Sequence, residues 1–227
     1  MKKSLLFYSC VFISAFYSCD RFIQDEKGGI DVISNIYFDA SKNLDKMQTI
    51  HISKINYNKN EMIEIVPNVE FSEINQEMFY IKDTLTYRIN TIDYNKTIFE
   101  DLSKTQNPIK IYNKKTGAVF SKEKILNYHY RVPLNDTILF NKKYKRFQIN
   151  TPKMYSRYYI YQTDTLLPYS LYKHIEKEYK GRLERIDTYN KEKDIFVTIQ
   201  LMTRKKWDEE AKEMFEYNQF LNNKNNE

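Results

Sequence analysis

Apolar and polar residues alternate at a period of two along much of the chain. The clearest instance is 78–94, where Phe79, Ile81, Leu85, Tyr87 and Ile89 recur at period two, with Lys82 and Arg88 among the residues between them. That pattern is typical of a strand with one solvated face, and Asp83-Thr84 is a candidate bend within it. Shorter runs predict strands at 30–38, 47–57 and 61–71. Pro67 interrupts the last run, which favours an edge strand or two short pieces.

Short polar turns divide the second half of the chain into strand-length runs. Hairpins are predicted for 109–112 with 118–120 and for 137–140 with 144–150. Four further runs, 157–162, 170–179, 183–189 and 195–203, predict the successive strands of an antiparallel meander. The abundance of Tyr, Ile, Phe and Thr supports this interpretation, because such side chains fit a pleated, half-buried surface.

Helical spacing occurs at two places. Apolar residues in 96–106 recur at helical intervals and stop before Asn107-Pro108, which predicts a short helix. A second helix is predicted from about 204 to 221, and we expect its apolar stripe to dock on the sheet. The stripe consists of Trp207, Ala211, Met214, Phe215 and Asn218. The predicted fold class is therefore mainly β, an antiparallel and strongly curved sheet or half-barrel closed by a C-terminal α-helix.

The first twenty residues follow a different pattern. Lys2 and Lys3 form a positive start, an apolar run covers 5–16, and the small Ser18 precedes Cys19. The run is too short to cross a bilayer comfortably, so it predicts a secretory signal rather than a transmembrane helix. Residues 20–29 are polar, end in two glycines, and predict a tether.

A cysteine directly after the apolar run resembles the lipobox of bacterial lipoproteins, in the looser form found in the Bacteroidota. The resemblance implies cleavage before Cys19 and its acylation, for example by palmitate. It divides the chain into a signal peptide at 1–18, an acylated cysteine and tether at 19–29, and a single β-rich domain at 30–227. It also implies a lipid anchor outside the cytoplasm, in the outer membrane, on the periplasmic or the surface face.

Two alternatives to acylation at Cys19 stay open. Cys10 is a competing site, but it lies inside the apolar run, and cleavage there would leave an apolar mature start. The other alternative is a conventional signal peptide with an incidental cysteine at position 19. With acylation at Cys19, cleavage removes Cys10 and the lipid occupies Cys19, so the folded domain has no cysteine for an internal disulfide or a cysteine nucleophile.

Charge gives little support for a nucleic-acid partner. The full chain carries a net charge of +6, and loss of Lys2 and Lys3 leaves 34 basic against 30 acidic residues, about +4. Basic and acidic residues interleave, except around Lys142-Lys-Tyr-Lys-Arg146. We expect a monomer whose partners are the membrane, through acylated Cys19, and an unknown envelope protein, glycan or lipid.

Glycine content excludes several catalytic motifs. The four glycines are Gly28, Gly29, Gly117 and Gly181. Phosphate loops and dinucleotide fingerprints need several closely spaced glycines, and the nucleophile elbow needs two that flank a serine. None of these spacings occurs, so we expect neither nucleotide binding nor that type of serine chemistry.

The histidines give no metal motif. His51, His129 and His174 are far apart, and the sequence His174-Ile-Glu-Lys-Glu178 lacks the second histidine of a metalloprotease helix. We therefore expect no metal and no cofactor. Lys115-Thr-Gly117 and Ser121-Lys-Glu-Lys124 match two motifs of penicillin-recognising serine enzymes, but in reversed order and nearly contiguous, so we interpret them as a turn and a connector. No residue is assigned as catalytic, and we expect that the protein is not an enzyme.

Three classes of function follow from these observations. The first is an exported, membrane-anchored lipoprotein with a binding or structural role in the cell envelope. The alternative is a carrier of lipid or another apolar ligand, because the long strand, the meander and the packed helix are similar in outline to LolA-like half-barrels. Asp164-Thr-Leu-Leu-Pro168 is also similar to the Asp and Leu-Pro turn of those proteins. An envelope hydrolase is the third class. A deep apolar cavity between the sheet and the helix would favour the carrier, and a filled core with an exposed tyrosine patch would favour the binding role. Convergent carboxylates in a cleft would favour the hydrolase.

Overall fold

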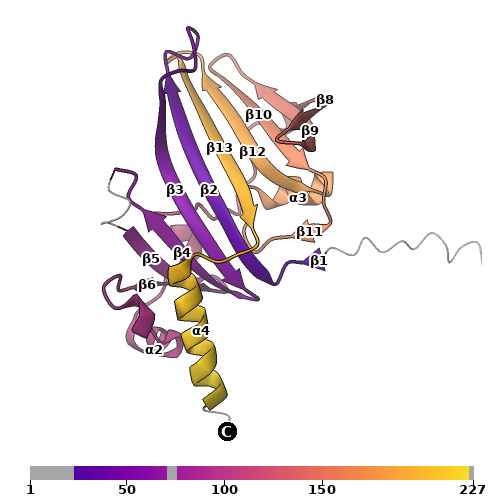
Figure 1. Cartoon of the computed structure of the whole chain (residues 1–227). Helices are drawn as coiled ribbons and strands as arrows, with labels where there is room; N and C mark the ends of the chain where they lie inside the picture. The colour runs from indigo at the N-terminus through magenta and orange to yellow at the C-terminus, as the bar shows by residue number, and fades with distance from the viewer. Residues whose placement is uncertain (1–22, 71–75, 225–227) are drawn as a thin grey trace, which may run out of the picture.

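A computed structural model describes residues 23–70 and 76–224, and within them one antiparallel sheet of 11 strands dominates the molecule (Figure 1). In spatial order the strands are β7 (Ile109–Lys110), β6 (Leu85–Ile89), β5 (Gln76–Lys82), β4 (Glu61–Pro67), β3 (Met47–Asn58), β2 (Lys27–Phe38), β13 (Ile195–Arg204), β12 (Arg182–Asn190), β10 (Met154–Tyr161), β9 (Lys142–Asn150) and β8 (Val132–Leu139). The sheet stays open, with β7 and β8 at its edges. The predicted fold class is confirmed.

Two chain segments build this sheet from its centre outwards. Strands β2 to β7 follow one another in chain order on one side, and β13 to β8 return in the opposite order on the other. They join where β13 pairs with β2, over ten residue pairs from Ile195–Phe38 to Arg204–Gly29. A separate parallel pair joins β1 (Ile23–Gln24) to β11 (Thr165–Leu166).

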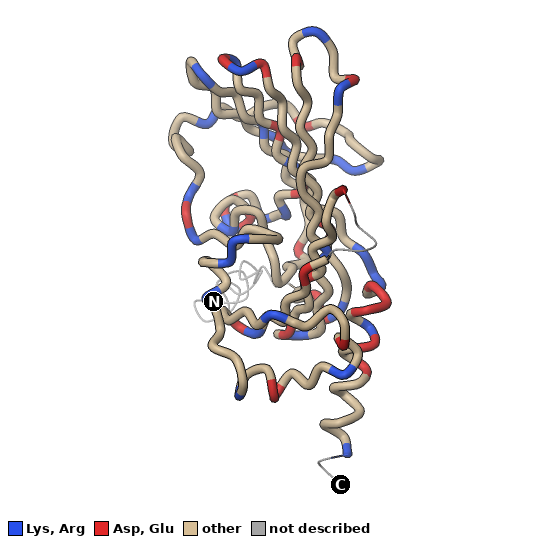
Figure 2. Tube along the Cα trace, turned by 90° about the vertical axis from the view of Figure 1, so that its left-hand side faces the viewer, with Lys and Arg blue, Asp and Glu red and all other residues tan. Residues whose placement is uncertain are grey.

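Helices cover the two faces of the sheet unequally. The longest, α4 (Glu209–Lys224), lies beside β4 and β5 in Figure 1 together with α2 (Phe99–Thr105), and α3 (Lys173–Tyr179) lies near β12. Short 3-10 turns occur at Tyr94–Lys96, Ile111–Asn113 and Tyr128–Tyr130. Figure 2 shows basic and acidic residues interleaved along the chain trace.

Apolar side chains of β4 and β5 point to both faces of the sheet, and both faces are buried at this point. Ile63 and Tyr80 pack with Met214 and Phe215 of α4, whereas Met62, Phe79 and Ile81 belong to the larger core on the opposite face. Because successive side chains of a strand point to opposite faces, each strand contributes to two separate cores. The apolar stripe of α4 therefore docks on the sheet, as predicted, with Ala211, Met214, Phe215 and Asn218 buried.

Segment 170–179 is not a strand, so this sequence prediction is wrong. Residues Lys173–Tyr179 form α3, and Lys180 closes the helix in the left-handed region at φ 48°. The backbone N–H of Gly181 donates to the carbonyl of Glu176, 3.2 Å away, as expected for a helix that ends in a left-handed residue. Leu171, Ile175 and Tyr179 are four residues apart, which is the spacing of a helix face, and Ile175 is the residue of α3 that is fully buried.

The hairpin predicted at 109–120 is also wrong. Ile109–Lys110 pairs with β6, and the chain then leaves the sheet through the turn at Ile111–Asn113. Residues 118–120 form no strand. Ala118 instead packs into the larger core, so tertiary contacts replaced the local turn that the sequence suggested.

Pro67 does not mark an edge strand. Strand β4 pairs with β3 on one side and β5 on the other, and Pro67 is its last residue. A proline at a strand end removes no hydrogen bond from the interior of the ladder. Within 78–94 the candidate bend is a hairpin turn, since Asp83 has φ 55° and the chain turns from β5 into β6 there.

The predicted tether ends earlier than expected. Strand β2 begins at Lys27, and Gly28 and Gly29 are buried within it. A Cβ atom on Gly28 would lie 2.6 Å from the hydroxyl of Tyr57, and one on Gly29 would lie 2.7 Å from the guanidinium carbon of Arg204. Gly28 and Gly29 therefore allow close packing across the sheet, and they are not part of a flexible linker.

Stability should depend on pH through Glu176 of α3. Burial raises the pKa of its carboxyl to about 7 from 4.5, although the backbone N–H of Leu183 and the charge of Arg182 favour the ionised form. The folded state therefore holds this proton more tightly than the unfolded state. Between these two pKa values the folded protein loses stability as pH rises, by up to about 3 kcal/mol.

Glu176→Gln should remove this dependence, because glutamine does not ionise and its amide oxygen still accepts the N–H of Leu183. We expect the urea midpoint of the variant to exceed that of wild type at about pH 8 and to match it at about pH 5. The same slope of midpoint against pH in both proteins would contradict the assignment.

Candidate functional site

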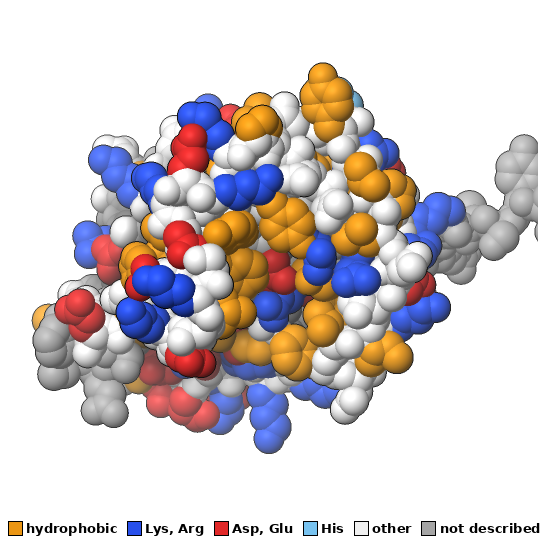
Figure 3. Space-filling model, turned by 90° about the horizontal axis from the view of Figure 1, so that it is seen from above, with side chains coloured by type: hydrophobic (Ala, Val, Ile, Leu, Met, Phe, Trp, Pro, Cys, Tyr) orange, Lys and Arg blue, Asp and Glu red, His pale blue; other side chains and the backbone are white. Residues whose placement is uncertain are grey.

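A cavity of about 410 Å³ lies between one face of the sheet and two segments that cross it. Its floor comes from strands β2, β3, β9, β10, β12 and β13. The segments 117–127 and 169–172 form its cover. Figure 3 shows hydrophobic side chains gathered around a hollow in the face of the molecule seen from above.

One row of side chains across the sheet defines the floor. The strand register aligns Tyr158 with Ile186, Ile186 with Ile199, Ile199 with Ser34, and Ser34 with His51. Directly opposed residues share a face of an antiparallel sheet, so the five side chains lie side by side. All five line the cavity, and this row is apolar over β10, β12 and β13 and polar at β2 and β3.

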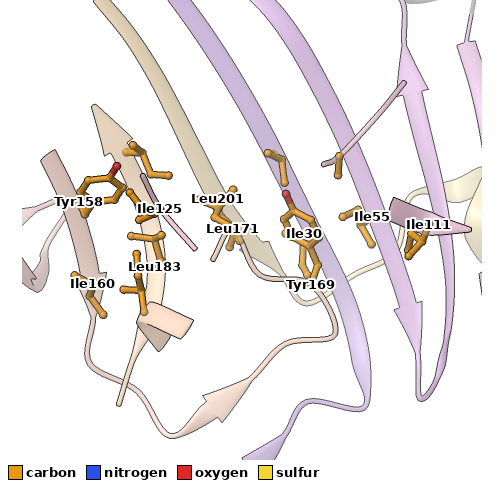
Figure 4. Close-up of a cluster of buried hydrophobic side chains, with 14 of the residues drawn as sticks. Ile30, Ile55, Ile111, Ile125, Tyr158, Ile160, Tyr169, Leu171, Leu183 and Leu201 are labelled. Atoms are coloured by element: carbon orange, nitrogen blue, oxygen red, sulfur yellow. The ribbon is translucent and has the colours of Figure 1, made fainter. Parts of the chain in front are cut away.

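The cover is apolar both inside and at its rim. Ile125, Tyr169 and Leu171 are buried against the sheet, and Figure 4 shows Ile125 and Leu171 beside Leu183 and Leu201. Val119 and Leu126 also line the cavity but are 74% and 83% exposed. Large apolar side chains left exposed at the rim of a cavity are typical of an entrance for an apolar ligand.

A buried ion pair holds the cover to the sheet. Glu64 of β4 is fully buried and is paired with Lys114, whose side chain is only 3% exposed. The same carboxylate accepts hydrogen bonds from the backbone N–H of Ala118 and from the hydroxyl of Ser53, 2.6 Å away. Burial lowers the pKa of Lys114, and the charge of Glu64 opposes this shift.

Gly117 lets the chain make this contact. Its φ of 80° lies in the left-handed region, where residues with a Cβ are strained. A Cβ atom at this position would also lie 2.3 Å from Oε1 of Glu64. The Lys-Thr-Gly sequence that matched a motif of serine enzymes therefore has a structural role, with the adjacent Lys114 as its buried cation.

The histidines do not converge. His51 lines the cavity, His129 contacts Tyr130 with tilted rings and 3.9 Å between ring centroids, and His174 lies edge-on to Tyr128. No group of three or more His, Cys, Asp or Glu among the described residues could hold a metal ion. Ser121, from the second motif, accepts a hydrogen bond from the backbone N–H of Glu123.

Cys19, the predicted acylation site, lies outside the described residues, as does the predicted signal peptide. Within 23–70 and 76–224, no helix is long and apolar enough to cross a membrane.

Comparisons with known proteins identify no family. The chain matches no protein-family model and no curated protein. A LolA superfamily protein from Nitrosomonas europaea has 9% identity and a TM-score of 0.30 over 88% of this chain and 95% of that chain. The protein PNGF-II has 8% identity and a TM-score of 0.35 over 81% of this chain but only 29% of that chain. A DUF1329 family protein from Desulfovibrio piger has 7% identity and a TM-score of 0.19 over 86% of this chain and 89% of that chain. Similarity this distant carries no functional argument, so the geometry of the cavity has to supply one.

Proposed function

We propose that this protein binds a small apolar ligand in the cavity on its sheet, and that acylated Cys19 holds it to a membrane outside the cytoplasm. The cavity carries the first half of the proposal. Its volume of about 410 Å³ lies within the range of ligand pockets, which is roughly 300–1,000 Å³. An apolar floor, an apolar cover and an apolar rim favour a ligand that transfers most of its surface out of water.

A second hollow, of about 910 Å³, lies beside the other apolar core, but charged residues line it together with the aromatic ones, so it suits an apolar ligand less well. Side chains of α4 and α2 pack directly on Ile63, Ile65 and Tyr80, and Phe99 stacks on Tyr80 at 4.2 Å between ring centroids. The sequence-based test for a carrier was a cavity between the sheet and the C-terminal helix. Connecting segments, and not α4, cover the apolar cavity of about 410 Å³, so α4 has a structural role in this proposal.

A docking role for an envelope protein is the second candidate, and the edge of the sheet favours it. Within the described part of the chain, strand β8 pairs with β9 alone, and Ile138 and Phe140 are 73% and 66% exposed beside this open edge. An extended segment of a partner could add a strand there. If the ligand experiment below fails, docking of an envelope protein becomes the better-supported function.

Filling the cavity should abolish ligand binding. A decanol that carries a photoreactive diazirine is presented to the full-length protein in lipid vesicles, and labelled peptides are identified by mass spectrometry. We expect labels on the segments that line the cavity, with at least a tenfold loss in apparent affinity for Ile199→Trp, because the indole would occupy the floor.

Met202→Trp is the matched control for this experiment. Met202 lies on the same strand as Ile199, three residues further on, so it points to the opposite face. We expect it to label like wild type. Labelling spread over the whole surface, or unchanged by Ile199→Trp, would contradict the proposed function.

Acylation at Cys19 has its own test. Cys19→Ala should move the protein from the membrane fraction to the soluble or the unprocessed fraction, because each acyl methylene buried in lipid contributes about 0.8 kcal/mol. Cys10→Ala is the control and should stay attached. Fractionation followed by immunoblotting measures both variants. Release of Cys10→Ala from the membrane would contradict anchoring through acylated Cys19. Membrane retention of processed Cys19→Ala would contradict it as well.

A further inference from the structure

The lining of the cavity contains no charged residue. Among the described residues that line it there is no Asp, Glu, Lys or Arg. The charges of Glu64 and Lys114, which act on His51 of the lining, are paired with each other. A charged group brought into this space would lose its hydration without gaining a counter-ion, and that transfer is strongly unfavourable.

The polar groups of the lining differ in whether they have partners. On the side of β10 and β12, Ser156 and Thr188 lie 3.2 Å apart, hydroxyl to hydroxyl, and bond to each other. On the side of β2 and β3, Ser34 and His51 face each other across the two strands. The Nε2 atom of His51 is buried and has no hydrogen-bond partner among the described residues.

An unpaired buried nitrogen is a site for a ligand group. A buried polar atom without a hydrogen-bond partner destabilises the folded state. A ligand group that bonds to this atom removes that penalty, and its affinity rises accordingly. Burial lowers the pKa of His51, an effect that the charge of Glu64 opposes and that of Lys114 reinforces. The imidazole is therefore neutral at neutral pH, and it suits a neutral partner.

We propose that the ligand is an uncharged amphiphile, whose apolar body fills the cavity and whose hydroxyl, amide or ester group bonds to His51 and Ser34. The proposal rests on the proposed function and specifies its ligand class. It separates neutral amphiphiles from fatty acids and from cationic amphiphiles, which share the apolar chain but carry a charge into an uncharged site.

The test compares photoreactive probes of equal chain length on the full-length protein in vesicles at neutral pH. The probes are decanol, chlorodecane, decanoate and decyltrimethylammonium, each quantified relative to its concentration in the bilayer. We expect decanol to label the cavity segments at least tenfold more strongly than either charged probe. Equal labelling by decanoate or by the cationic probe would overturn the proposal.

Variants then locate the polar contact. His51→Leu should weaken labelling by decanol about tenfold, and Ser34→Ala about threefold, because one hydrogen bond is lost in each. Neither variant should change labelling by chlorodecane more than twofold, since that probe has no comparable hydrogen-bonding group. His51→Gln, which keeps a donor and an acceptor, should restore most of the affinity for decanol.

His174→Leu is the matched control, because His174 also has a buried Nε2 atom without a partner but does not line the cavity. We expect it to label like wild type with every probe. Thermal melts of each variant confirm that it is folded. An equal loss of decanol and chlorodecane in His51→Leu would overturn the assignment of the polar contact and leave the proposed function standing.

Two further outcomes complete the test. If no probe labels the cavity segments, the proposed function fails, and the ligand class fails with it. A photoreactive diacylglycerol distinguishes the source of the ligand. Labelling of the cavity by diacylglycerol indicates a membrane lipid, and labelling by decanol alone indicates a free small amphiphile. Either result supports the ligand class.

Discussion

Glu64→Leu should lower the free energy of unfolding by about 3–5 kcal/mol, because it leaves the ammonium of Lys114 buried without its counter-ion. The variant also removes the acceptor for the N–H of Ala118 and the hydroxyl of Ser53. Because these contacts hold the cover of the cavity, the variant should bind ligand more weakly as well as being less stable. Urea unfolding followed by tyrosine fluorescence measures the first effect, and probe labelling measures the second.

The double variant Glu64→Leu with Lys114→Met tests the cause. Removing both charges together should recover much of the lost stability, because no unpaired charge remains in the core. Glu100→Leu is the surface control: its partner Lys104 lies 2.7 Å away, and the side chains of Lys104 and Glu100 are 61% and 68% exposed. We expect almost no change in the free energy of unfolding there. Equal losses in the single and the double variant would contradict an ion-pair origin.

Phe215→Ala should cost about 3–5 kcal/mol, because a buried aromatic side chain is replaced by a cavity. Phe215 of α4 is 3% exposed and contacts Trp207 and Phe99, with ring centroids 4.7 and 6.0 Å apart. Phe99 in turn stacks on Tyr80 of the sheet. The substitution therefore opens the contact between helix and sheet, and we expect a lower melting temperature with unchanged labelling by decanol.

Phe220→Ala is the control on the same helix, where the side chain is 62% exposed and a change within about 0.5 kcal/mol is expected. Trp207→Ala should fall between the two. Trp207 precedes α4 and is partly exposed, with the ammonium of Lys27 3.8 Å from its ring centroid and an N–H donated to the carbonyl of Tyr57. A loss of decanol labelling in Phe215→Ala would show that α4 belongs to the ligand site and would contradict its structural role.

Much of the sheet could be predicted because strands have a local signature. Period-two alternation located most of the long strands, and polar turns between apolar runs located hairpins such as the one between β8 and β9. Prediction failed where the local pattern was ambiguous. Residues 170–179 form a run of strand length between polar turns, but Leu171, Ile175 and Tyr179 are four residues apart, and Lys173–Tyr179 forms a helix that packs on β12.

The candidate site could not be predicted from the sequence in the same way. Glu64 and Lys114 are 50 residues apart, and each alone resembles an ordinary solvated charge. Only their shared burial identifies them as a pair. His51 was noted as an isolated histidine, and its position opposite Ser34 follows from the register of β2 and β3, which includes an irregularity just after Ser34. A shift of one residue would move His51 to the other face.

The sequence by itself determined the mainly β class, the antiparallel order of neighbouring hairpins and the amphipathic C-terminal helix. These features depend on periodicity and turn chemistry, which act over a few residues. Only the tertiary structure decided that β13 pairs with β2, that β4 and β5 are buried on both faces, and that the segments 117–127 and 169–172 cover a cavity. These features depend on contacts between residues far apart in the chain, whose free energy comes from burial and from the pairing of buried charges, and no local pattern records them.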